Sequence, residues 1–332
     1  MEGFAIENMK YKLLLTEPEG FSQDAREILD SFCDVKAEYS TYEELLEKIK
    51  NFDILFVRLG IHFDRALLSK GKWLKYLVSP TTGLDHIDLQ AAKGFGIEVL
   101  SLKGETEFLK EVLATAELTW GLLLSLVRYI PSAFEDVKAG DWDRDSFKGN
   151  ELSRKRLGIL GLGRLGEIVA RYGTAFGMEV IAFDPYREDW ISGIERADNL
   201  EKLLANSDVL SVHVPLNAET EGMLGERELT FMPRGSWIVN TSRGKILDEN
   251  ALLKHLISGH LAGAGLDVLT DEVQADNWAV HNKLVQYSKN NPNLIITPHV
   301  GGATYESMEK TELFMAKKLK KMIDALNRTQ SL

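Results

Sequence analysis

The sequence predicts an α/β protein built from parallel sheets, and three observations support that fold class. Short apolar runs alternate with segments of helical spacing along the 332 residues. A glycine-rich stretch, Gly161-x-Gly163-x-x-Gly166, follows one apolar run and opens a helical segment. Polar side chains gather where the later apolar runs end. These features predict two doubly wound units, of which the second binds a dinucleotide.

Composition narrows the class of protein. Hydrophobic residues make up 44% of the chain, which indicates a globular protein rather than a disordered one. The net charge of −11 argues against non-specific binding to nucleic acid or anionic membranes. Cys33 is the single cysteine and rules out an internal disulfide. The first ten residues lack the apolar core of a signal peptide, and the apolar stretch 118–130 is too short to span a bilayer. We therefore expect a soluble cytoplasmic protein.

The first part of the chain alternates strands and helices without a glycine fingerprint. We expect Asp24 and Thr41 to cap helices over 24–32 and 41–49. The expected strands cover residues 12–15, 53–57, 76–79 and 98–100. A parallel sheet covered by helices follows from this order, and its lack of the glycine motif predicts that the dinucleotide binds elsewhere.

The alternation continues through the rest of the chain. One long helix is expected over 108–129, with a domain boundary near its start and an irregular loop at 141–153. The last helix, expected over 306–328, carries an amphipathic stripe typical of packing. Further strands are expected at 157–160, 180–183, 209–214, 236–240, 263–268 and 294–297, with helices at 167–176, 200–205 and 248–260.

The glycine motif has the physical features needed to hold a dinucleotide. Gly161 permits a tight turn, Gly163 lets the backbone approach a pyrophosphate, and Gly166 lets the helix pack closely on its strand. The start of that helix presents N–H groups to the phosphates. Asp184 ends the next strand, where it can accept hydrogen bonds from both ribose hydroxyls and repel a 2′-phosphate. This arrangement favours NAD over NADP.

Two features of the first unit are candidates for binding an anion. The small residues of Ser79-Pro80-Thr81-Thr82-Gly83-Leu84-Asp85-His86 follow a strand end and leave backbone N–H groups free to meet an anion. An ordinary strand-to-helix turn is the alternative. Arg58 also stands at a strand end, where it could hold a substrate anion or form a surface ion pair.

Polar residues at the strand ends of the second unit fit the reduction of a carbonyl by hydride. Such a reaction needs a proton donor, a polarising group and a substrate anchor. His299, Glu272 and Arg243 match these roles as acid, supporting carboxylate and carboxylate-binding cation. The alternatives are a structural histidine for His299 and an ion pair of Arg243 with Asp267 or Asp248. His213 is interpreted as a structural residue at a strand end.

Five stretches make the chain resemble the D-isomer-specific 2-hydroxyacid dehydrogenase family, which includes D-3-phosphoglycerate, D-lactate and glyoxylate/hydroxypyruvate enzymes. The resemblance covers about residues 12 to 326 and implies two doubly wound domains, the second inserted in the first. It implies a flavodoxin-like substrate-binding domain over 1–107 plus 300–332 and an NAD-binding Rossmann domain over 108–299. The five stretches are Gly161-Leu162-Gly163-Arg164-Leu165-Gly166, His213-Val214-Pro215-Leu216, Asn240-Thr241-Ser242-Arg243-Gly244, Gly265-Leu266-Asp267-Val268 and Thr297-Pro298-His299-Val300-Gly301-Gly302.

The resemblance also assigns expected roles to individual residues. It implies that Arg243, Glu272 and His299 are catalytic, and that His299 is the acid/base of an NAD-dependent interconversion of a 2-hydroxy and a 2-keto acid. It implies a homodimer formed through the cofactor domain. Substrate contacts are expected from Arg58, Thr82, Gly83, Leu84 and Arg243. Cofactor contacts are expected from Thr82, Gly161, Gly163, Arg164, Leu165, Gly166, Asp184, Val214, Pro215, Thr241, Ser242, Arg243, Asp267, His299 and Gly302.

Two departures from the family pattern leave alternatives open. Val273 follows Glu272 where the family often has proline, and the segment 274–293 is longer than usual. Asp271 and Asp276 are therefore alternative carboxylates. An NADH-sensing corepressor of the same fold is the alternative function, while Glu272 argues against formate chemistry because the formate enzymes carry glutamine there. No Cys/His cluster has the spacing of metal ligands, so no metal is expected.

Overall fold

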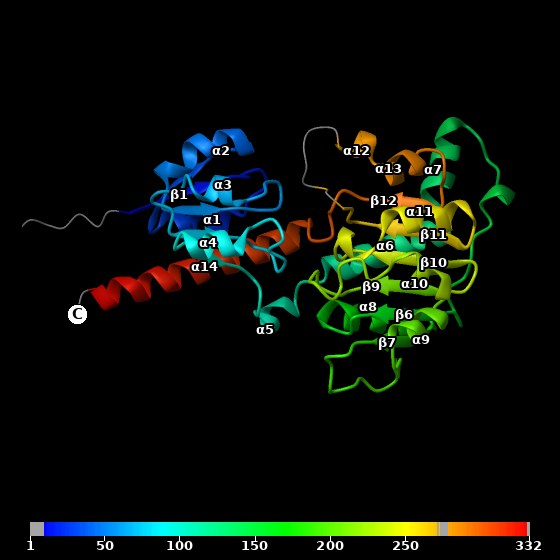
Figure 1. Ribbon diagram of the computed structural model, residues 1–332. Coiled ribbons are helices and arrows are strands. Elements are labelled where there is room, and N and C mark those ends of the chain that lie inside the picture. Colours follow the sequence, from blue (N-terminus) through cyan, green and yellow to red (C-terminus); the bar gives the residue numbers. More distant parts are fainter. Residues whose placement is uncertain (1–9, 271, 273–277, 331–332) are drawn as a thin grey trace, which may run out of the picture. The chain divides into compact units, whose positions relative to one another are not determined.

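The computed structural model describes residues 10–270, 272 and 278–330 (Figure 1). The chain divides into two compact units, one formed by Met1–Val112 with Tyr305–Leu332 and the other by Leu113–Thr304. The second unit is therefore inserted into the first. Each unit contains a parallel sheet with helices on both faces, which confirms the predicted fold class.

The sheet of the first unit has the strand order β2-β1-β3-β4-β5, and all four pairings are parallel. Its central strands are runs of buried apolar residues, as expected for a sheet covered on both faces. This is the flavodoxin-like order, with a switch point between β1 and β3. The strands are β1 (Tyr11–Leu15), β2 (Cys33–Ala37), β3 (Ile54–Phe56), β4 (Tyr76–Val78) and β5 (Glu98–Leu100).

Two apolar cores cover the faces of this sheet. One core joins the sheet to α1 and α14, which pack against each other, and the other joins it to α2, α3 and α4. Ser22, not Asp24 as expected, caps α1, because its hydroxyl accepts the N–H of Ala25. Thr41 caps α2 in a capping box with Glu44. The helices are α1 (Gln23–Asp30), α2 (Tyr42–Lys48), α3 (Arg65–Leu68), α4 (Leu89–Gly94), α5 (Thr106–Leu109) and α14 (Tyr305–Gln330), with a 3₁₀ turn at Ile49–Asn51.

The sheet of the second unit has the strand order β12-β11-β10-β9-β6-β7-β8. All its pairings are parallel, so the carboxyl ends of its strands meet at one edge. Counted from β6, this is the dinucleotide-binding order, and the switch point lies between β6 and β9. The strands are β6 (Arg156–Leu160), β7 (Glu179–Phe183), β8 (Glu195–Arg196), β9 (Val209–Val212), β10 (Ser236–Asn240), β11 (Leu261–Leu266) and β12 (Leu294–Ile296).

Helices also cover both faces of this second sheet. Trp120 of α6 and Val169 of α8 belong to the core on one face, and Leu203, Leu229 and Leu252 of α9, α10 and α11 belong to the core on the other. The helices are α6 (Ala114–Val127), α7 (Ile130–Ala139), α8 (Arg164–Ala175), α9 (Leu200–Ala205), α10 (Glu226–Phe231), α11 (Glu249–Ile257), α12 (Trp278–His281) and α13 (Lys283–Ser288), with 3₁₀ turns at Asp145–Phe147 and Gly244–Ile246.

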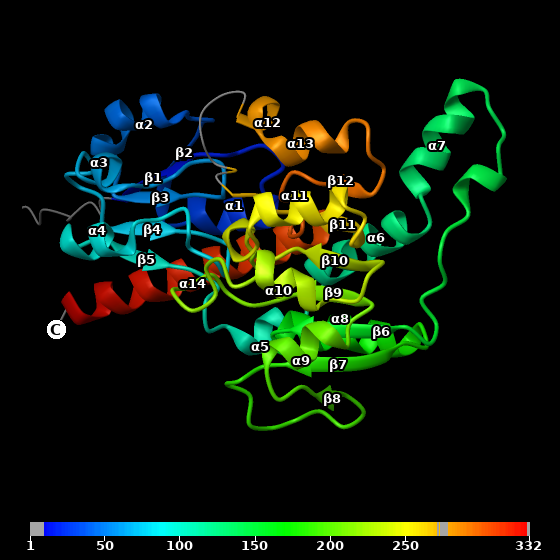
Figure 2. The same cartoon turned by 45° about the vertical axis from the view of Figure 1, so that its right-hand side comes forward.

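The prediction of one long helix over 108–129 is wrong, because this region forms two separate helices, α5 and α6. Tyr129, in the left-handed region at φ 53°, then turns the chain into α7. Figure 2 shows α7 and the segment after it standing away from the sheet of their unit, and α7 buries none of its residues. No single described helix is long and apolar enough to cross a membrane. Among the described residues, one pair of segments, 106–127 and 130–139, has the combined length and apolar composition of a membrane span. The two segments are bent by 60° relative to each other.

Candidate active site

The glycine turn between β6 and α8 depends on the absence of side chains at two positions. Gly161 has φ +90°, and a Cβ there would lie 2.8 Å from the carbonyl oxygen of His213. A Cβ on Gly166 would lie 2.1 Å from the carbonyl oxygen of Gly161, so the helix could not pack on the turn. By contrast, nothing lies within 4 Å of a Cβ built on Gly163. The backbone of Gly163 therefore borders open space at the start of α8.

This open space has the chemistry of an anion site. No side chain caps the twelve-residue helix α8, whose N-cap is Gly163, so its first N–H groups are presented to whatever lies in front of them. Arg164 opens the helix, and burial lowers the pKa of its guanidinium. Because a pyrophosphate needs N–H donors and close backbone approach, these residues fit a dinucleotide.

Asp184 follows β7 beside the same turn, and two backbone groups hold its carboxylate. Its Oδ2 accepts the N–H of Leu162 at 3.0 Å, and its Oδ1 accepts the N–H of Tyr186 at 3.0 Å. Each carboxylate oxygen retains a second lone pair for a ligand hydroxyl. The position suits an acceptor of ribose hydroxyls next to a pyrophosphate.

The end of β9 closes over the turn. Val214 would contact a Cβ on Gly161 at 2.8 Å, so this expected cofactor residue lies against the glycine turn. His213 is half-buried, and its Nε2 lies 2.7 Å from the hydroxyl of Ser211. Burial lowers the pKa of His213 to about 4. A neutral imidazole at physiological pH favours the structural role expected for His213.

The end of β10 carries Arg243 on a loop held by its own side chains. Asn240 donates to the carbonyl oxygen of Arg243 at 3.0 Å and accepts the N–H of Ser242 at 3.0 Å. The hydroxyl of Thr241 lies 2.8 Å from that of Thr119 on α6. A Cβ on Gly244 would lie 2.1 Å from the carbonyl carbon of Leu269, so this loop is in backbone contact with the segment that follows β11.

Asp267 follows β11 and organises the loop that follows β12. Its Oδ1 accepts the hydroxyl of Thr297 at 2.6 Å and the N–H of Val300 at 2.9 Å, and its Oδ2 accepts the N–H of Gly301 at 2.7 Å. Its own carbonyl oxygen accepts the N–H of His299 at 2.9 Å. Burial raises the pKa of Asp267 against the opposing effect of these bonds. Both carboxylate oxygens thus serve the loop that carries His299.

His299 and Glu272 form a direct pair at this edge of the sheet. The Nδ1 of His299 lies 2.5 Å from Oε1 of Glu272, and the two side chains are 27% and 20% exposed. The second oxygen of Glu272 accepts the N–H of Leu269 at 3.1 Å, which fixes the carboxylate. His299 has a left-handed backbone, with φ 54°. Nδ1 is therefore engaged by a carboxylate, and Nε2 is the nitrogen left for a substrate.

The segment around Glu272 is anchored on α11. The carboxylate of Glu249 accepts the N–H of Thr270 at 2.5 Å and the side-chain amide of Asn282 at 3.0 Å. Asp271, Val273 and Asp276 lie outside the described residues. The carboxylate of Glu272, which is described, lies on His299.

In the first unit, side-chain bonds shape the turn that follows β4. The hydroxyl of Thr81 donates to the carbonyl oxygen of Gly83 at 2.8 Å and lies 2.9 Å from the hydroxyl of Ser79. Nε2 of the buried His86 lies 3.3 Å from the same Ser79 hydroxyl. His86 therefore joins the chain of side-chain contacts that links Ser79 and Thr81 to the carbonyl oxygen of Gly83.

Arg58, also in the first unit, forms a buried ion pair. Its guanidinium binds Oε1 of Glu312 on α14, whose side chain is 1% exposed, and donates to the carbonyl oxygen of Glu19 at 2.9 Å. The other oxygen of Glu312 accepts the N–H of Ser22 at 2.8 Å. The structure thus favours the ion-pair alternative for Arg58, with a buried partner rather than a surface one.

Replacing Arg58 with alanine is expected to destabilise the protein by about 3–5 kcal/mol, because Glu312 is left buried without its cation. Urea denaturation followed by circular dichroism would measure the loss. Arg65→Ala, which removes an exposed arginine from α3 of the same unit, is the matched control and should change the free energy of unfolding by less than about 1 kcal/mol. Similar losses in both variants would contradict the structural role of Arg58.

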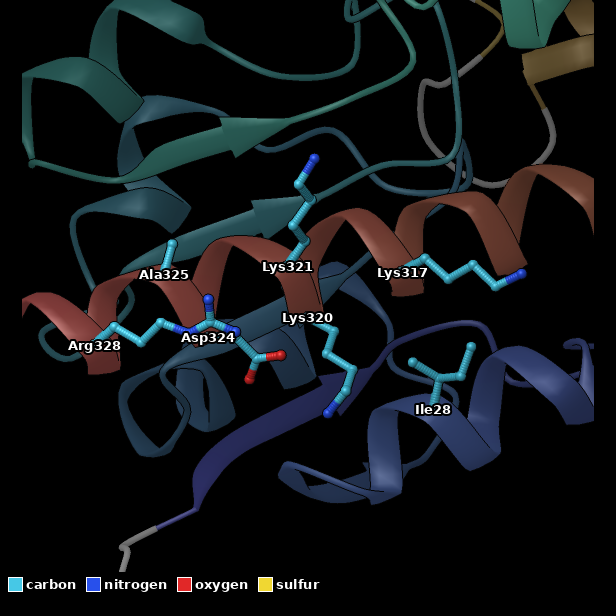
Figure 3. Close-up of a pocket in the computed structure, with 7 residues that line it drawn as sticks. All are labelled: Ile28, Lys317, Lys320, Lys321, Asp324, Ala325 and Arg328. Carbon is cyan, nitrogen blue, oxygen red and sulfur yellow. The ribbon is translucent and has the colours of Figure 1, made fainter.

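A groove of about 600 Å³ lies between α1 and α14 in the first unit, and none of the residues that line it is a predicted site residue (Figure 3). Its lining includes Lys317, Lys320, Lys321 and Arg328. In Figure 3, Lys320 and Lys321 point to opposite sides of α14, so these cations do not converge on one ligand position. The groove therefore does not compete with the strand ends of the second unit as the active site.

The turn, the acid after β7 and the histidine–carboxylate pair all follow carboxyl ends of one parallel sheet. This combination of fold and site is typical of oxidoreductases that bind a nicotinamide dinucleotide. Residues 120–301 match the family model "D-isomer specific 2-hydroxyacid dehydrogenase, NAD binding domain". The chain belongs to the D-isomer-specific 2-hydroxyacid dehydrogenase family.

Three known proteins illustrate this relationship. D-3-phosphoglycerate dehydrogenase of Methanocaldococcus jannaschii is 37% identical over 316 residues, which cover 94% of this chain and 57% of that protein. Hydroxypyruvate reductase of Thermotoga maritima is 34% identical over 312 residues, covering 93% and 97%. D-lactate dehydrogenase of Aquifex aeolicus, solved with NAD and lactic acid, superposes with a TM-score of 0.82 at 30% identity, covering 95% and 96%.

The lengths of these relatives differ. The chain spans 57% of the M. jannaschii phosphoglycerate dehydrogenase and 47% of its counterpart in Bacillus subtilis, but almost the whole of the T. maritima reductase. The named relatives are dehydrogenases and reductases, which supports an enzyme and not the regulatory alternative.

Proposed function

We propose that this chain interconverts a small 2-keto acid and the corresponding D-2-hydroxy acid with NADH and NAD. The observation that carries the proposal is the 2.5 Å contact between His299 Nδ1 and Glu272 Oε1, within the unit that holds the glycine turn. A histidine held by a carboxylate at a strand end is the acid/base that such a reaction needs.

His299 is proposed to transfer a proton to and from the substrate oxygen, with Glu272 supporting its ring. When bound, the reduced nicotinamide supplies a hydride to the keto carbon, so the keto oxygen gains negative charge. His299 donates the proton on Nε2 to that oxygen, while the Glu272 carboxylate stabilises the charged ring at Nδ1. In the direction of oxidation the same nitrogen accepts the proton from the hydroxyl group.

Arg243 and the turn after β4 are proposed to hold the substrate. The guanidinium of Arg243 offers paired donors to a carboxylate and polarises the neighbouring oxygen. By the family resemblance, the N–H groups of the Thr82-Gly83-Leu84 turn also bind the substrate carboxylate. Both groups are proposed to bind the carboxylate, which every 2-keto acid has. They would therefore select the class of substrate and would not discriminate between substrate side chains.

The cofactor is proposed to be NAD rather than NADP. The carboxylate of Asp184 is fixed beside the glycine turn by the N–H groups of Leu162 and Tyr186. Its charge would repel a 2′-phosphate, while its free lone pairs would accept the ribose hydroxyls.

The single Cys33, which is buried and forms no disulfide, suits the cytoplasmic location that we also propose.

Steady-state kinetics on 2-keto acids of graded size and charge would test the proposal. NADH oxidation is expected with at least one of them, and a D-2-hydroxy acid is the expected product in a chiral assay. NADH binding without turnover on any acid of the panel would instead favour a regulatory protein. Comparison of Arg58→Lys with the wild type on singly and doubly charged acids would show whether Arg58 also meets a second anion.

We also propose that the chain forms a homodimer through its cofactor-binding unit. Ile130, Phe134 and Val137 lie at helical spacing on α7, and Trp142 follows them, each at least half exposed. Apolar side chains on one face of a projecting helix are costly to leave in water. A second copy of the chain would cover them.

Phe134→Lys is expected to convert the dimer into a monomer, because it places a charge at the centre of this apolar face. Sedimentation velocity would give the mass of each species. Tyr39→Lys, which changes an exposed aromatic residue of the other unit, should remain dimeric. A wild-type monomer, or an unaltered dimer in Phe134→Lys, would refute the interface on α7.

A further inference from the structure

Arg187, for which the sequence analysis predicts no role, lies on the glycine turn. Its Nη1 donates to the carbonyl oxygen of Leu162 at 2.5 Å, and the same nitrogen forms an ion pair with Glu167 on the first turn of α8. Its Nε donates to the carbonyl oxygen of Asp189 at 2.6 Å. The side chain is 15% exposed, so the guanidinium is held tightly against the turn.

Leu162 connects this cation to the proposed ribose acceptor. The N–H of Leu162 donates to Asp184, and the carbonyl oxygen of Leu162 accepts Arg187. One residue's backbone therefore separates a carboxylate from a guanidinium. In a dinucleotide site, the group next to the ribose acceptor is the one that meets a 2′-phosphate if one is present.

Arginine at that place would ordinarily attract a 2′-phosphate, since its paired donors match phosphate oxygens. Here two carboxylates already bind the guanidinium. Glu167 contacts Nη1, and the carboxylate of Asp189 lies 3.4 Å from Nη2. Of these two, Glu167 is the less exposed partner and belongs to the helix that opens the phosphate site.

We propose that Glu167 is a positioning residue that sets cofactor choice through Arg187. By holding the guanidinium on the glycine turn and neutralising it, Glu167 keeps this cation from offsetting the charge of Asp184 towards a 2′-phosphate. Selectivity for NADH then has two causes. Asp184 repels a 2′-phosphate, and Glu167 keeps Arg187 from binding one. The inference rests on the proposed function, because it takes Asp184 as the ribose acceptor.

Four variants separate the two parts. Asp184→Ser removes the repulsion, and Glu167→Gln in that background removes the carboxylate that pairs with Nη1 of Arg187. Adding Arg187→Ala to the pair removes the cation. Glu188→Gln with Asp184→Ser is the matched control, because Glu188 is an exposed carboxylate next in sequence to Arg187 without a contact to it among the described residues. Dissociation constants for NADH and NADPH, from quenching of tryptophan fluorescence, are the readout.

Glu167→Gln is expected to tighten NADPH binding by about tenfold over Asp184→Ser alone, with NADH affinity changed less than about twofold. The gain should vanish when Arg187→Ala is added and should be absent with Glu188→Gln. No gain, an equal gain with Glu188→Gln, or a gain that survives Arg187→Ala would each overturn the inference. Because the readout is a ratio of two affinities, a general loss of stability does not imitate the expected result.

The same titrations distinguish this inference from the proposed function. Wild-type protein that binds neither NADH nor NADPH would refute the proposed cofactor site itself, and the inference with it. Wild-type protein that prefers NADH, together with variants that behave as the control does, would refute only the role of Glu167. Glu167→Gln alone should also bind NADPH more tightly than the wild type, by a smaller factor because Asp184 remains.

Discussion

His299→Ala is expected to lower turnover by about 100-fold or more while leaving the affinity for NADH nearly unchanged. The variant loses the imidazole that pairs with Glu272, but it keeps the glycine turn and Asp184. The keto oxygen must then be protonated by water, which raises the barrier of the chemical step. Steady-state kinetics with saturating keto acid, together with NADH titration, would separate the two effects.

His281→Ala is the control for this experiment. His281 ends α12 and is exposed, so its loss should leave turnover within about twofold of the wild type. If His299→Ala kept near-normal turnover, His299 would be a structural histidine, which was the alternative raised from the sequence. Loss of NADH binding together with turnover would instead indicate a damaged cofactor site.

Glu272→Gln is expected to lower the turnover number by on the order of 100-fold. The amide is close in size to the carboxylate, so the packing around it should persist. An amide carries no charge, however, to stabilise the protonated ring at Nδ1, 2.5 Å away in the wild-type protein. The effect should fall on the turnover number rather than on the affinity for NADH, which binds through other residues.

The neighbouring carboxylates provide the comparison. Asp271→Asn and Asp276→Asn remove the same charge within a few positions in sequence, and neither should lower turnover by more than about threefold. A large loss in Asp276→Asn, with near-normal activity of Glu272→Gln, would move the supporting role to Asp276. These three variants therefore settle the choice of carboxylate that the missing proline after Glu272 leaves open in the sequence.

Features that depend on neighbouring residues in sequence could be predicted. The glycine turn is one, because Gly161 adopts φ +90° and a Cβ on Gly166 would meet the carbonyl oxygen of Gly161 within the same motif. The cap of α2 by Thr41 is another, since its side chain accepts the N–H of Glu44. In both cases the physical requirement lies within a few residues of the signal.

Other features had no local signal. Periodicity continues through residues 108–129, yet Phe108 packs in the core of the first unit and Leu113 in the core of the second, so the helix breaks where the chain passes between units. The strands β2 and β8 went unpredicted because they are edge strands with mostly exposed residues. Edge positions need no continuous apolar run.

Several residues that support the site were also missed. Glu249 holds the segment before Glu272, and Glu167 and Arg187 pair across the glycine turn. Each contact joins residues about twenty positions apart, and charged residues at such spacing are common on any surface. Asp267 was expected as a cofactor contact or as an ion-pair partner of Arg243, whereas the structure adds its bonds to the loop that carries His299.

The left-handed backbone of His299 carries a cost that selection for activity must accept. A non-glycine residue at φ 54° is less favourable than glycine there by about 1 kcal/mol, because its Cβ crowds the following carbonyl group. A screen for thermal tolerance alone would therefore enrich glycine or asparagine at this position and discard the proton donor with it. Selection for activity and selection for stability are therefore expected to favour different residues at position 299.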